Sequence, residues 1–193
     1  MHHNANLAEI FEFYGTDKVE YALAYEHFLK TKRHEVLKVL EIGIGTLIPE
    51  ARWSMVGWGA PHYKPGGSLR SWRDYFPNAD IMGFDVQPDT QFREERISTF
   101  ICDSTDGNAV SAVIEERNFR DIDLIVDDGS HRPTDQLSTL KNCFKFLRHG
   151  GLYVIEDVGG GEIFNYKTDI SEIVGKSVIF NIGLGFNPIF IIK

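Results

Sequence analysis

The chain has 193 residues, 42% of them hydrophobic and 25% charged, which suits one globular domain with a sizeable core. Its net charge of −8 argues against nucleic acid as the main partner, because phosphate binding relies on clustered Lys and Arg. The chain has no apolar run of about 18 residues, and its N-terminus lacks the basic flank and apolar core of a secretory signal. We therefore expect a cytoplasmic protein without a membrane partner.

Helical and extended patterns alternate along the chain. Helical spacing in an N-terminal segment, 1–35, predicts helices over 6–14 and 20–34, separated by a polar turn at 14–18. Apolar runs then predict five strands, over 36–45, 79–86, 97–105, 122–129 and 151–158. Helical patterns between these strands predict helices over 69–77, 108–118 and 134–150. Two final apolar runs, 176–183 and 187–193, predict an antiparallel hairpin that turns through residues 184–186.

Strands separated by helices imply βαβ units, so we expect one α/β domain over residues 1–193 with a mainly parallel sheet. The longest irregular stretch, 46–68, exceeds ordinary connections, which favours a lid or a binding loop. Its aromatic side chains could cover a ligand or could pack the loop onto the body. The sequence leaves both interpretations open. Two cysteines are too few for a disulfide framework, and we expect buried, reduced thiols at Cys102 and Cys143.

Acidic residues end two of the predicted strands. Asp127 and Asp128 lie at the end of one strand, with His131 three residues later, and Glu156 and Asp157 lie at the end of another. In an open α/β sheet the carboxyl ends of neighbouring strands line one crevice, so these side chains can converge there. Carboxylate oxygens suit a divalent cation, and an imidazole suits a general base. A lone histidine is more often structural, but this loop position at the edge of a ligand site favours the catalytic interpretation of His131.

A second set of residues indicates an adenosine-containing cofactor. Gly43 and Gly45 follow a strand and let the backbone approach a ligand closely, although this motif is weak on its own. Asp85 ends the next strand and could accept from two ribose hydroxyls, and Asp103, one strand further, could face an adenine amino group. Either acid could instead be a solvated residue at a strand end. Ser68 precedes a predicted helix as a candidate N-cap, where free N–H groups can hold a carboxylate.

Together these residues resemble class I S-adenosylmethionine-dependent methyltransferases. More closely, the chain resembles the catalytic domain of metal-dependent sugar O-methyltransferases of macrolide biosynthesis, of the mycinamicin and tylosin type. The matching segments cover most of the chain: YGTDK (14–18), LEIGIG (40–45), PGGSLRSWRDYFPNADIMGFDV (65–86), CDSTD (102–106), DLIVDDGSH (123–131) and GGLYVIEDV (150–158). The resemblance implies a Rossmann-like, seven-stranded sheet of order 3-2-1-4-5-7-6 that closes with an antiparallel hairpin.

The resemblance also implies roles for individual residues. It implies S-adenosylmethionine contacts from Glu41, Gly43 and Gly45 on the methionine and ribose side, Ser68 near the carboxylate, Asp85 at the ribose and Asp103 at the adenine side. It implies Mg²⁺, or another divalent cation, held by Asp128, Glu156 and Asp157. It implies His131 as the general base. Members of this family can carry a large N-terminal auxiliary domain, which this sequence does not contain.

The expected function is metal-assisted methyl transfer to a hydroxyl of a small molecule. The resemblance favours a sugar of a glycosylated natural product, and a catechol-like diol is compatible with the same chemistry. A nicotinamide oxidoreductase would require the full G-x-G-x-x-G motif and a Tyr-Lys or similar proton relay, and the sequence has neither. A non-catalytic adenosine-binding or interaction module is a further alternative, but such a module has little use for three metal acids and His131. A homo-oligomer is compatible with the sequence, which does not determine the oligomeric state.

Overall fold

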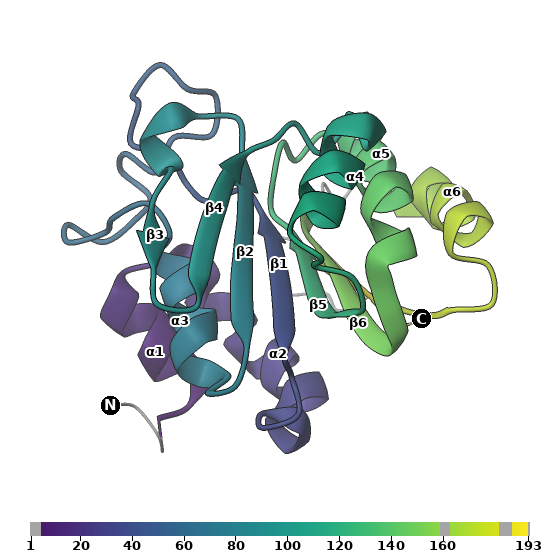
Figure 1. Cartoon of the computed structure of the whole chain (residues 1–193), viewed down its shortest axis with the longest axis horizontal. Coiled ribbons are helices and arrows are strands. Elements are labelled where there is room, and N and C mark those ends of the chain that lie inside the picture. Colours follow the sequence, from purple (N-terminus) through teal and green to yellow (C-terminus); the bar gives the residue numbers. More distant parts are fainter. Residues whose placement is uncertain (1–4, 159–162, 182–186, 193) are drawn as a thin grey trace.

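A computed structural model describes residues 5–158, 163–181 and 187–192 (Figure 1). Within these residues, eight strands form one sheet of order β3-β4-β2-β1-β5-β6-β8-β7. The strands are β1 Lys38–Ile42, β2 Asp80–Asp85, β3 Arg93–Glu94, β4 Ile97–Ile101, β5 Ile122–Asp127, β6 Leu147–Val158, β7 Val178–Asn181 and β8 Asn187–Ile192. The helices are α1 Leu7–Tyr14, α2 Ala22–Leu29, α3 Gly67–Tyr75, α4 Gly107–Glu116, α5 Pro133–Cys143 and α6 Ile163–Val174.

The sheet confirms the predicted fold class and strand order. Numbered along the chain, the seven predicted strands read 3-2-1-4-5-7-6 across the sheet, and β3 adds a two-residue antiparallel edge strand beside β4. Strands β4, β2, β1, β5 and β6 pair in parallel, whereas β8 pairs antiparallel with both β6 and β7. The predicted hairpin is thus present as a strand pair, and its turn at 184–186 lies outside the described residues.

Helices cover both faces of the sheet (Figure 1). Side chains of α1, α2 and α3 share one core cluster with Val39, Leu124 and Val154, and side chains of α4, α5 and α6 share another with Leu40 and Tyr153. Successive strand residues point to opposite faces, so a strand covered on both sides needs a continuous apolar run. This requirement explains the short apolar runs at residues 39–40 of β1, 124–126 of β5 and 152–155 of β6. No described helix has the length and apolar character needed to cross a membrane.

The N-terminal segment is helical, but not as two uninterrupted helices. Helix α1 begins after the N-cap Asn6, whose side chain accepts from the Glu9 N–H at 2.9 Å, and it ends at Gly15 with φ of 70°. The predicted helix 20–34 is three pieces: a 3₁₀ turn Asp17–Tyr21, then α2, then a 3₁₀ turn Lys30–Lys32. The first turn starts inside the predicted polar turn at 14–18 and carries residues of the candidate site.

Two further differences occur late in the chain. The helix predicted over 134–150 ends at Cys143, and β6 begins at Leu147, because Leu147 pairs with Ile122 ahead of a register shift in the strand. Gly150, which resembled a helix end, instead takes a φ of 75° within β6. Helix α6 was not predicted, although Ile170 and Val174 are buried at helical spacing. The cysteine prediction is confirmed, since Cys102 and Cys143 are both buried and free.

Candidate active site

A pocket of about 390 Å³ lies at the carboxyl ends of the parallel strands. It falls within the usual range of about 300–1,000 Å³ for small-molecule sites. Six of the residues predicted from the sequence line it: Gly43, Gly45, Asp85, Asp103, Asp128 and His131. Register brings them together, because β1 ends at Ile42, which pairs with Phe84 on one side and Asp127 on the other. A larger surface groove between α5 and α6, of about 640 Å³, contains none of the predicted residues.

Close backbone packing explains the two glycines after β1. Gly43 and Gly45 have φ of 88° and 86°, in the left-handed region. A Cβ on Gly43 would lie 1.9 Å from the carbonyl oxygen of Asp128, and one on Gly45 would lie 2.1 Å from the Tyr63 hydroxyl. Gly43 therefore lets the loop after β1 approach the end of β5, and Gly45 lets the same loop pack against Tyr63 of the long loop.

The two acids predicted to face the nucleoside stand at neighbouring strand ends. Asp85 is half-buried, and its carboxylate accepts from the N–H groups of Ile44 and Gln87, both at 2.8 Å. Burial raises the pKa of Asp85, although the hydrogen bonds from these two N–H groups act to lower it. Asp103 is exposed, and its carboxylate accepts from the backbone and hydroxyl of Thr105 at 2.9 and 2.7 Å. Both acids line the pocket, and their ribose and adenine roles stay predictions.

Three side chains form a group of metal-binding type beside the pocket. The donor atoms of Asp128, His131 and Asp157 lie within 4.8 Å of one another. Nε2 of His131 is 3.1 Å from Oδ1 of Asp128 and 3.5 Å from Oδ2 of Asp157. His131 and Asp157 both have φ of 53°, a conformation uncommon outside glycine that is often found at functional sites. The fold thus gathers two carboxylates and an imidazole from the ends of β5 and β6.

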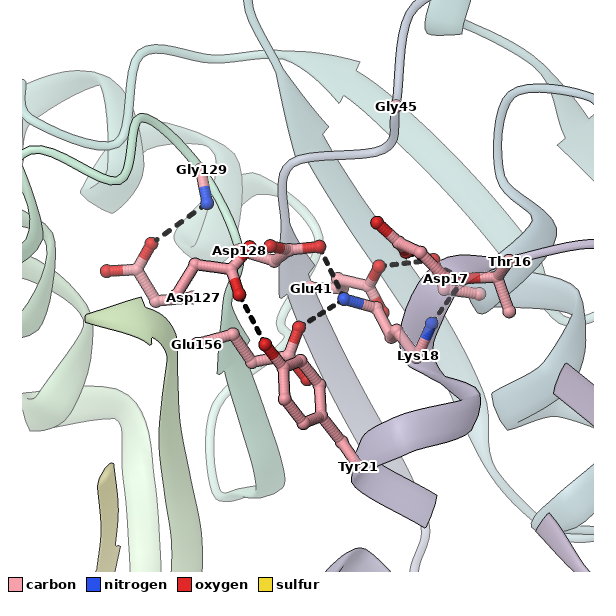
Figure 2. A network of polar contacts seen from close by, with 12 residues as sticks. Thr16, Asp17, Lys18, Tyr21, Glu41, Gly45, Asp127, Asp128, Gly129 and Glu156 are labelled. Carbon is pink, nitrogen blue, oxygen red and sulfur yellow. Dashed lines mark hydrogen bonds and ion pairs between the residues drawn. The ribbon is translucent and has the colours of Figure 1, made fainter. Parts of the chain in front are cut away.

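The third predicted metal ligand, Glu156, lies in a different environment. It is fully buried, one carboxylate oxygen accepts from the Lys18 ammonium, and the other accepts from the Tyr25 hydroxyl. Figure 2 shows Lys18 between Glu156 and Asp128, to which it also donates. Glu156 is therefore outside the group formed by Asp128, His131 and Asp157. Its role as a metal ligand stays a prediction.

Charge explains the protonation states in this cluster. Burial by itself would raise the pKa of Asp128, but the Lys18 charge and the His131 hydrogen bond together lower it to about 2. Burial would lower the pKa of Lys18, and the carboxylates of Asp128 and Glu156 instead hold it well above its usual range. Burial would also lower the pKa of His131, but its bond to Asp128 raises it. A cationic Lys18 and an ionised Asp128 are therefore the stable pair.

Glu41 and Ser68 contact each other rather than the pocket. Glu41 is fully buried and accepts from the Ser68 hydroxyl and from the indole N–H of Trp72. The N-cap interpretation of Ser68 is wrong, because Gly66 occupies that position with φ of 82° and Ser68 lies inside the first turn of α3. Neither Glu41 nor Ser68 lines the pocket, and their predicted contacts with the cofactor stay predictions.

The buried position of Glu41 predicts a pH-dependent stability difference. Burial raises the pKa of Glu41 from 4.5 to about 7, so the folded state binds this proton more tightly than the unfolded state does. The stability that protonated Glu41 contributes to the folded state is therefore fully present below pH 4.5 and is lost as pH rises through 7. We expect the free energy of unfolding of Glu41→Gln, measured relative to wild type, to increase by roughly 3 kcal/mol from pH 4 to pH 8. Urea unfolding at several pH values measures this, with the exposed Glu12→Gln as control. A difference that does not vary with pH would contradict the prediction.

Sequence reasoning missed several side chains that shape the site. Lys18 and Tyr21 come from the segment interpreted only as a polar turn and a helix start, and the Tyr21 hydroxyl donates to Oδ1 of Asp157. A lysine with an exposed fraction of 2% is unusual, but its burial is invisible in local spacing. In the long loop, Trp53 packs against His131 with ring centroids 4.8 Å apart.

The long loop packs onto the body and also contributes to the lining of the pocket, and its role as a lid or binding loop stays a prediction. Trp53 lines the pocket. Tyr63 is buried and its hydroxyl donates to the carbonyls of Ile44 and Gly45 at 2.9 and 3.2 Å, which packs the loop onto the body. Trp58 is 76% exposed and does neither.

Comparison with known proteins places this site in context. No family model matches the chain. It is 37% identical over 134 residues to an 8-demethyl-8-(2-methoxy-alpha-L-rhamnosyl)-tetracenomycin-C 3'-O-methyltransferase of Streptomyces olivaceus, covering 69% of this chain and 31% of that protein. It is 33% identical over 134 residues to a mycinamicin VI 2''-O-methyltransferase of Micromonospora griseorubida, covering 69% of this chain and 30% of that protein. The chain thus spans about a third of the length of these curated relatives.

Solved structures agree with the sequence relatives. MycE, a methyltransferase of the mycinamycin pathway solved with Mg, SAH and mycinamycin VI, superposes with a TM-score of 0.75 at 25% identity. The match covers 99% of this chain and 54% of that one. The sheet order and the pocket at its carboxyl edge define a class I S-adenosylmethionine-dependent methyltransferase fold. The chain is, more particularly, a homologue of the sugar O-methyltransferases that act in antibiotic biosynthesis.

Proposed function

We propose that the chain is the catalytic domain of an S-adenosylmethionine-dependent, divalent-metal-assisted O-methyltransferase that methylates a sugar hydroxyl of a glycosylated small molecule. One observation carries this proposal: a single pocket joins Gly43, Gly45, Asp85 and Asp103 to the acid and imidazole pair of Asp128 and His131. A cofactor and an acceptor must meet in this way for methyl transfer. The net charge of −8 supports a small-molecule acceptor rather than nucleic acid, and a cytoplasmic location belongs to the same proposal.

The donor set fits a divalent cation. Asp128 and Asp157 offer carboxylate oxygens close together, which hard cations such as Mg²⁺ prefer, and the group contains no thiolate. These two acids would hold the metal, with Glu156 as the third predicted ligand. When bound, the metal supplies positive charge that lowers the pKa of an acceptor hydroxyl. His131 is then left to take the proton.

His131 is held for that task by its neighbours. Oδ1 of Asp128 lies 3.1 Å from Nε2, and Trp53 packs against the ring. In the proposed step the acceptor oxygen attacks the methyl carbon of the sulfonium, the new O–C bond forms as the S–C bond breaks, and the hydroxyl proton passes to His131. The chain contributes mainly by holding the two reactants and the base in place, which can supply much of the rate.

Calorimetric titration with S-adenosylmethionine and S-adenosylhomocysteine, in Mg²⁺ and then in EDTA, tests the proposal. Both ligands should bind in Mg²⁺, and methyl transfer to a sugar acceptor should require the metal. Absence of binding under both conditions would overturn the proposal and favour the interaction-module alternative.

The cofactor site also makes a specific mutational prediction. We expect Asp85→Asn to weaken S-adenosylhomocysteine binding by about tenfold, because a hydrogen bond to a charged group contributes about 1.5–3 kcal/mol. Asp89→Asn is the matched control. The Asp89 carboxylate also accepts hydrogen bonds from a loop, from the Thr46 hydroxyl at 2.6 Å and from the Leu47 N–H at 2.8 Å, but Asp89 does not line the pocket. Calorimetry on both variants measures the effect. Equal affinities in the two variants would remove Asp85 from the cofactor site.

A further inference from the structure

Tyr63 is a buried tyrosine against which three glycines pack. A Cβ on Gly45 would lie 2.1 Å from its hydroxyl, one on Gly59 would lie 2.8 Å from its Cβ and Cγ, and one on Gly67 would lie 3.0 Å from its ring. Gly45 follows β1 (Figure 2), Gly59 belongs to the long loop, and Gly67 begins α3. The ring of Tyr63 therefore fills the space where these three segments meet, and its position is tightly determined.

The hydroxyl of Tyr63 holds two consecutive backbone carbonyls. It lies 2.9 Å from the carbonyl oxygen of Ile44 and 3.2 Å from that of Gly45, and these two acceptors share its single proton. The N–H of Gly66 also donates to the Ile44 carbonyl, at 3.0 Å. Gly45 and Thr46 line the pocket and Tyr63 does not. Tyr63 can therefore act on a bound ligand only through this stretch of backbone.

The two carbonyls determine the direction of two N–H groups. In a trans peptide unit the N–H points opposite to the C=O, and the described residues contain no cis peptide bond. The carbonyls of Ile44 and Gly45 face Tyr63, so the N–H groups of Gly45 and Thr46, which belong to the same peptide units, point away from it. No hydrogen bond within the described part of the chain uses either N–H. Backbone donors need a partner, and these two are available to a ligand.

Successive backbone N–H groups in a turn form a concavity that binds anions. Gly45, with φ of 86°, has the left-handed conformation that such turns use. The carboxylate of the amino-acid part is the only anionic group of S-adenosylmethionine and of S-adenosylhomocysteine. The chemistry of the two donors therefore matches this end of the cofactor rather than its uncharged adenosine.

We propose that Tyr63 is a positioning residue for the cofactor: its hydroxyl fixes the backbone from Ile44 to Thr46 so that the N–H groups of Gly45 and Thr46 receive the cofactor carboxylate. This inference rests on the cofactor site of the proposed function. Loss of the hydroxyl leaves the Gly45 carbonyl without its donor, and the peptide unit between Gly45 and Thr46 is then free to turn. The same loss leaves the aromatic packing in place.

Calorimetry with two ligands tests this inference without any measurement of activity. The first ligand is S-adenosylhomocysteine, and the second is its decarboxylated analogue, titrated directly or in competition with the first. We expect Tyr63→Phe to bind S-adenosylhomocysteine about tenfold more weakly than wild type, because hydrogen bonds to a charged group are lost. Its affinity for the analogue should stay within about twofold, since a double-mutant cycle couples only groups that act together.

Two further variants complete the experiment. Tyr14→Phe is the matched control, because it also removes a bonded hydroxyl, which donates to Asp74 at 2.7 Å outside the pocket, and both affinities should match wild type. Gly59→Ala keeps the Tyr63 hydroxyl but displaces its ring. It should weaken S-adenosylhomocysteine binding by about threefold, as partial loss of a hydrogen bond does, and spare the analogue. Gly59→Ala decides the question if Tyr63→Phe does not fold.

The outcomes separate this inference from the proposed function. Equal losses for both ligands in Tyr63→Phe would show a purely structural role for Tyr63 and would overturn the inference, as would wild-type affinity for S-adenosylhomocysteine in Tyr63→Phe or, if that variant does not fold, in Gly59→Ala. Equal binding of the two ligands by wild type would remove the carboxylate from the N–H pair and leave the methyltransferase assignment standing. Binding of neither ligand by wild type would overturn the proposed function together with the inference.

Discussion

Replacing His131 with alanine is expected to lower the rate of methyl transfer by about 10²- to 10⁴-fold, the usual contribution of a general base, while cofactor affinity stays unchanged. The imidazole lines the pocket next to Asp128 and has no contact with Asp85 or Asp103 at the cofactor side. Single-turnover formation of S-adenosylhomocysteine, with the best acceptor from a screen that begins with rhamnosides, measures the rate. Calorimetry measures the affinity.

Two further variants make the His131 result interpretable. His131 has φ of 53°, which asparagine tolerates better than alanine, so His131→Asn removes the base with less backbone strain. His149→Ala is the control for an exposed histidine outside the pocket. We expect the alanine and asparagine variants of His131 to be equally slow and His149→Ala to match wild type. Wild-type rates in both His131 variants would rule out the base role.

Replacing Trp72 with alanine is expected to lower the free energy of unfolding by about 4 kcal/mol, as large-to-small changes at buried aromatic residues do. Trp72 is fully buried in the core cluster beneath α1 and α2. Its ring packs edge-on against Phe11 and Tyr25, with centroids 5.1 and 4.9 Å away, and its N–H donates to Glu41. The substitution opens a cavity and also leaves a buried carboxylate short of a donor.

Urea unfolding at pH 7 measures the Trp72 effect. Trp72→Phe keeps most of the ring and removes the N–H, so its loss should be about 1–3 kcal/mol, the cost of one unsatisfied buried group. Trp58→Ala is the matched control, because Trp58 is 76% exposed and its truncation should change stability by less than about 0.5 kcal/mol. A loss below about 1 kcal/mol in Trp72→Ala would contradict the packing argument.

Local patterns predicted most of the fold. The apolar runs of β1, β2, β5 and β6 follow from burial on both faces of the sheet, and their spacing along the chain implies βαβ connections. The helix boundaries that were predicted wrongly have local causes as well. Gly150 resembles the end of a helix although it lies in β6, and the break between Tyr21 and α2 has no strong sequence signal. The family resemblance, rather than periodicity, supplied the order of the strands.

The candidate site was predictable where it depends on strand ends. Gly43, Asp85, Asp103 and Asp128 each lie at the carboxyl end of a predicted strand, and parallel pairing brings them to one edge of the sheet. The positions of Glu41 and Ser68 relative to the pocket were not predictable in this way. Their orientation depends on which face of β1 and α3 they occupy, and the hydrogen bonds with Trp72 hold them in the core.

The sequence by itself determined the class of fold, the crevice at the strand ends and the types of residue that meet there, because these depend on local periodicity and on the geometry of parallel strands. Only the tertiary structure decided how the acids are divided between partners. Lys18 pairs with Asp128 and Glu156 across more than a hundred residues, and Tyr21 and Tyr25 complete their surroundings. Such pairing depends on how the N-terminal segment docks against the sheet, and local spacing carries no information about that contact.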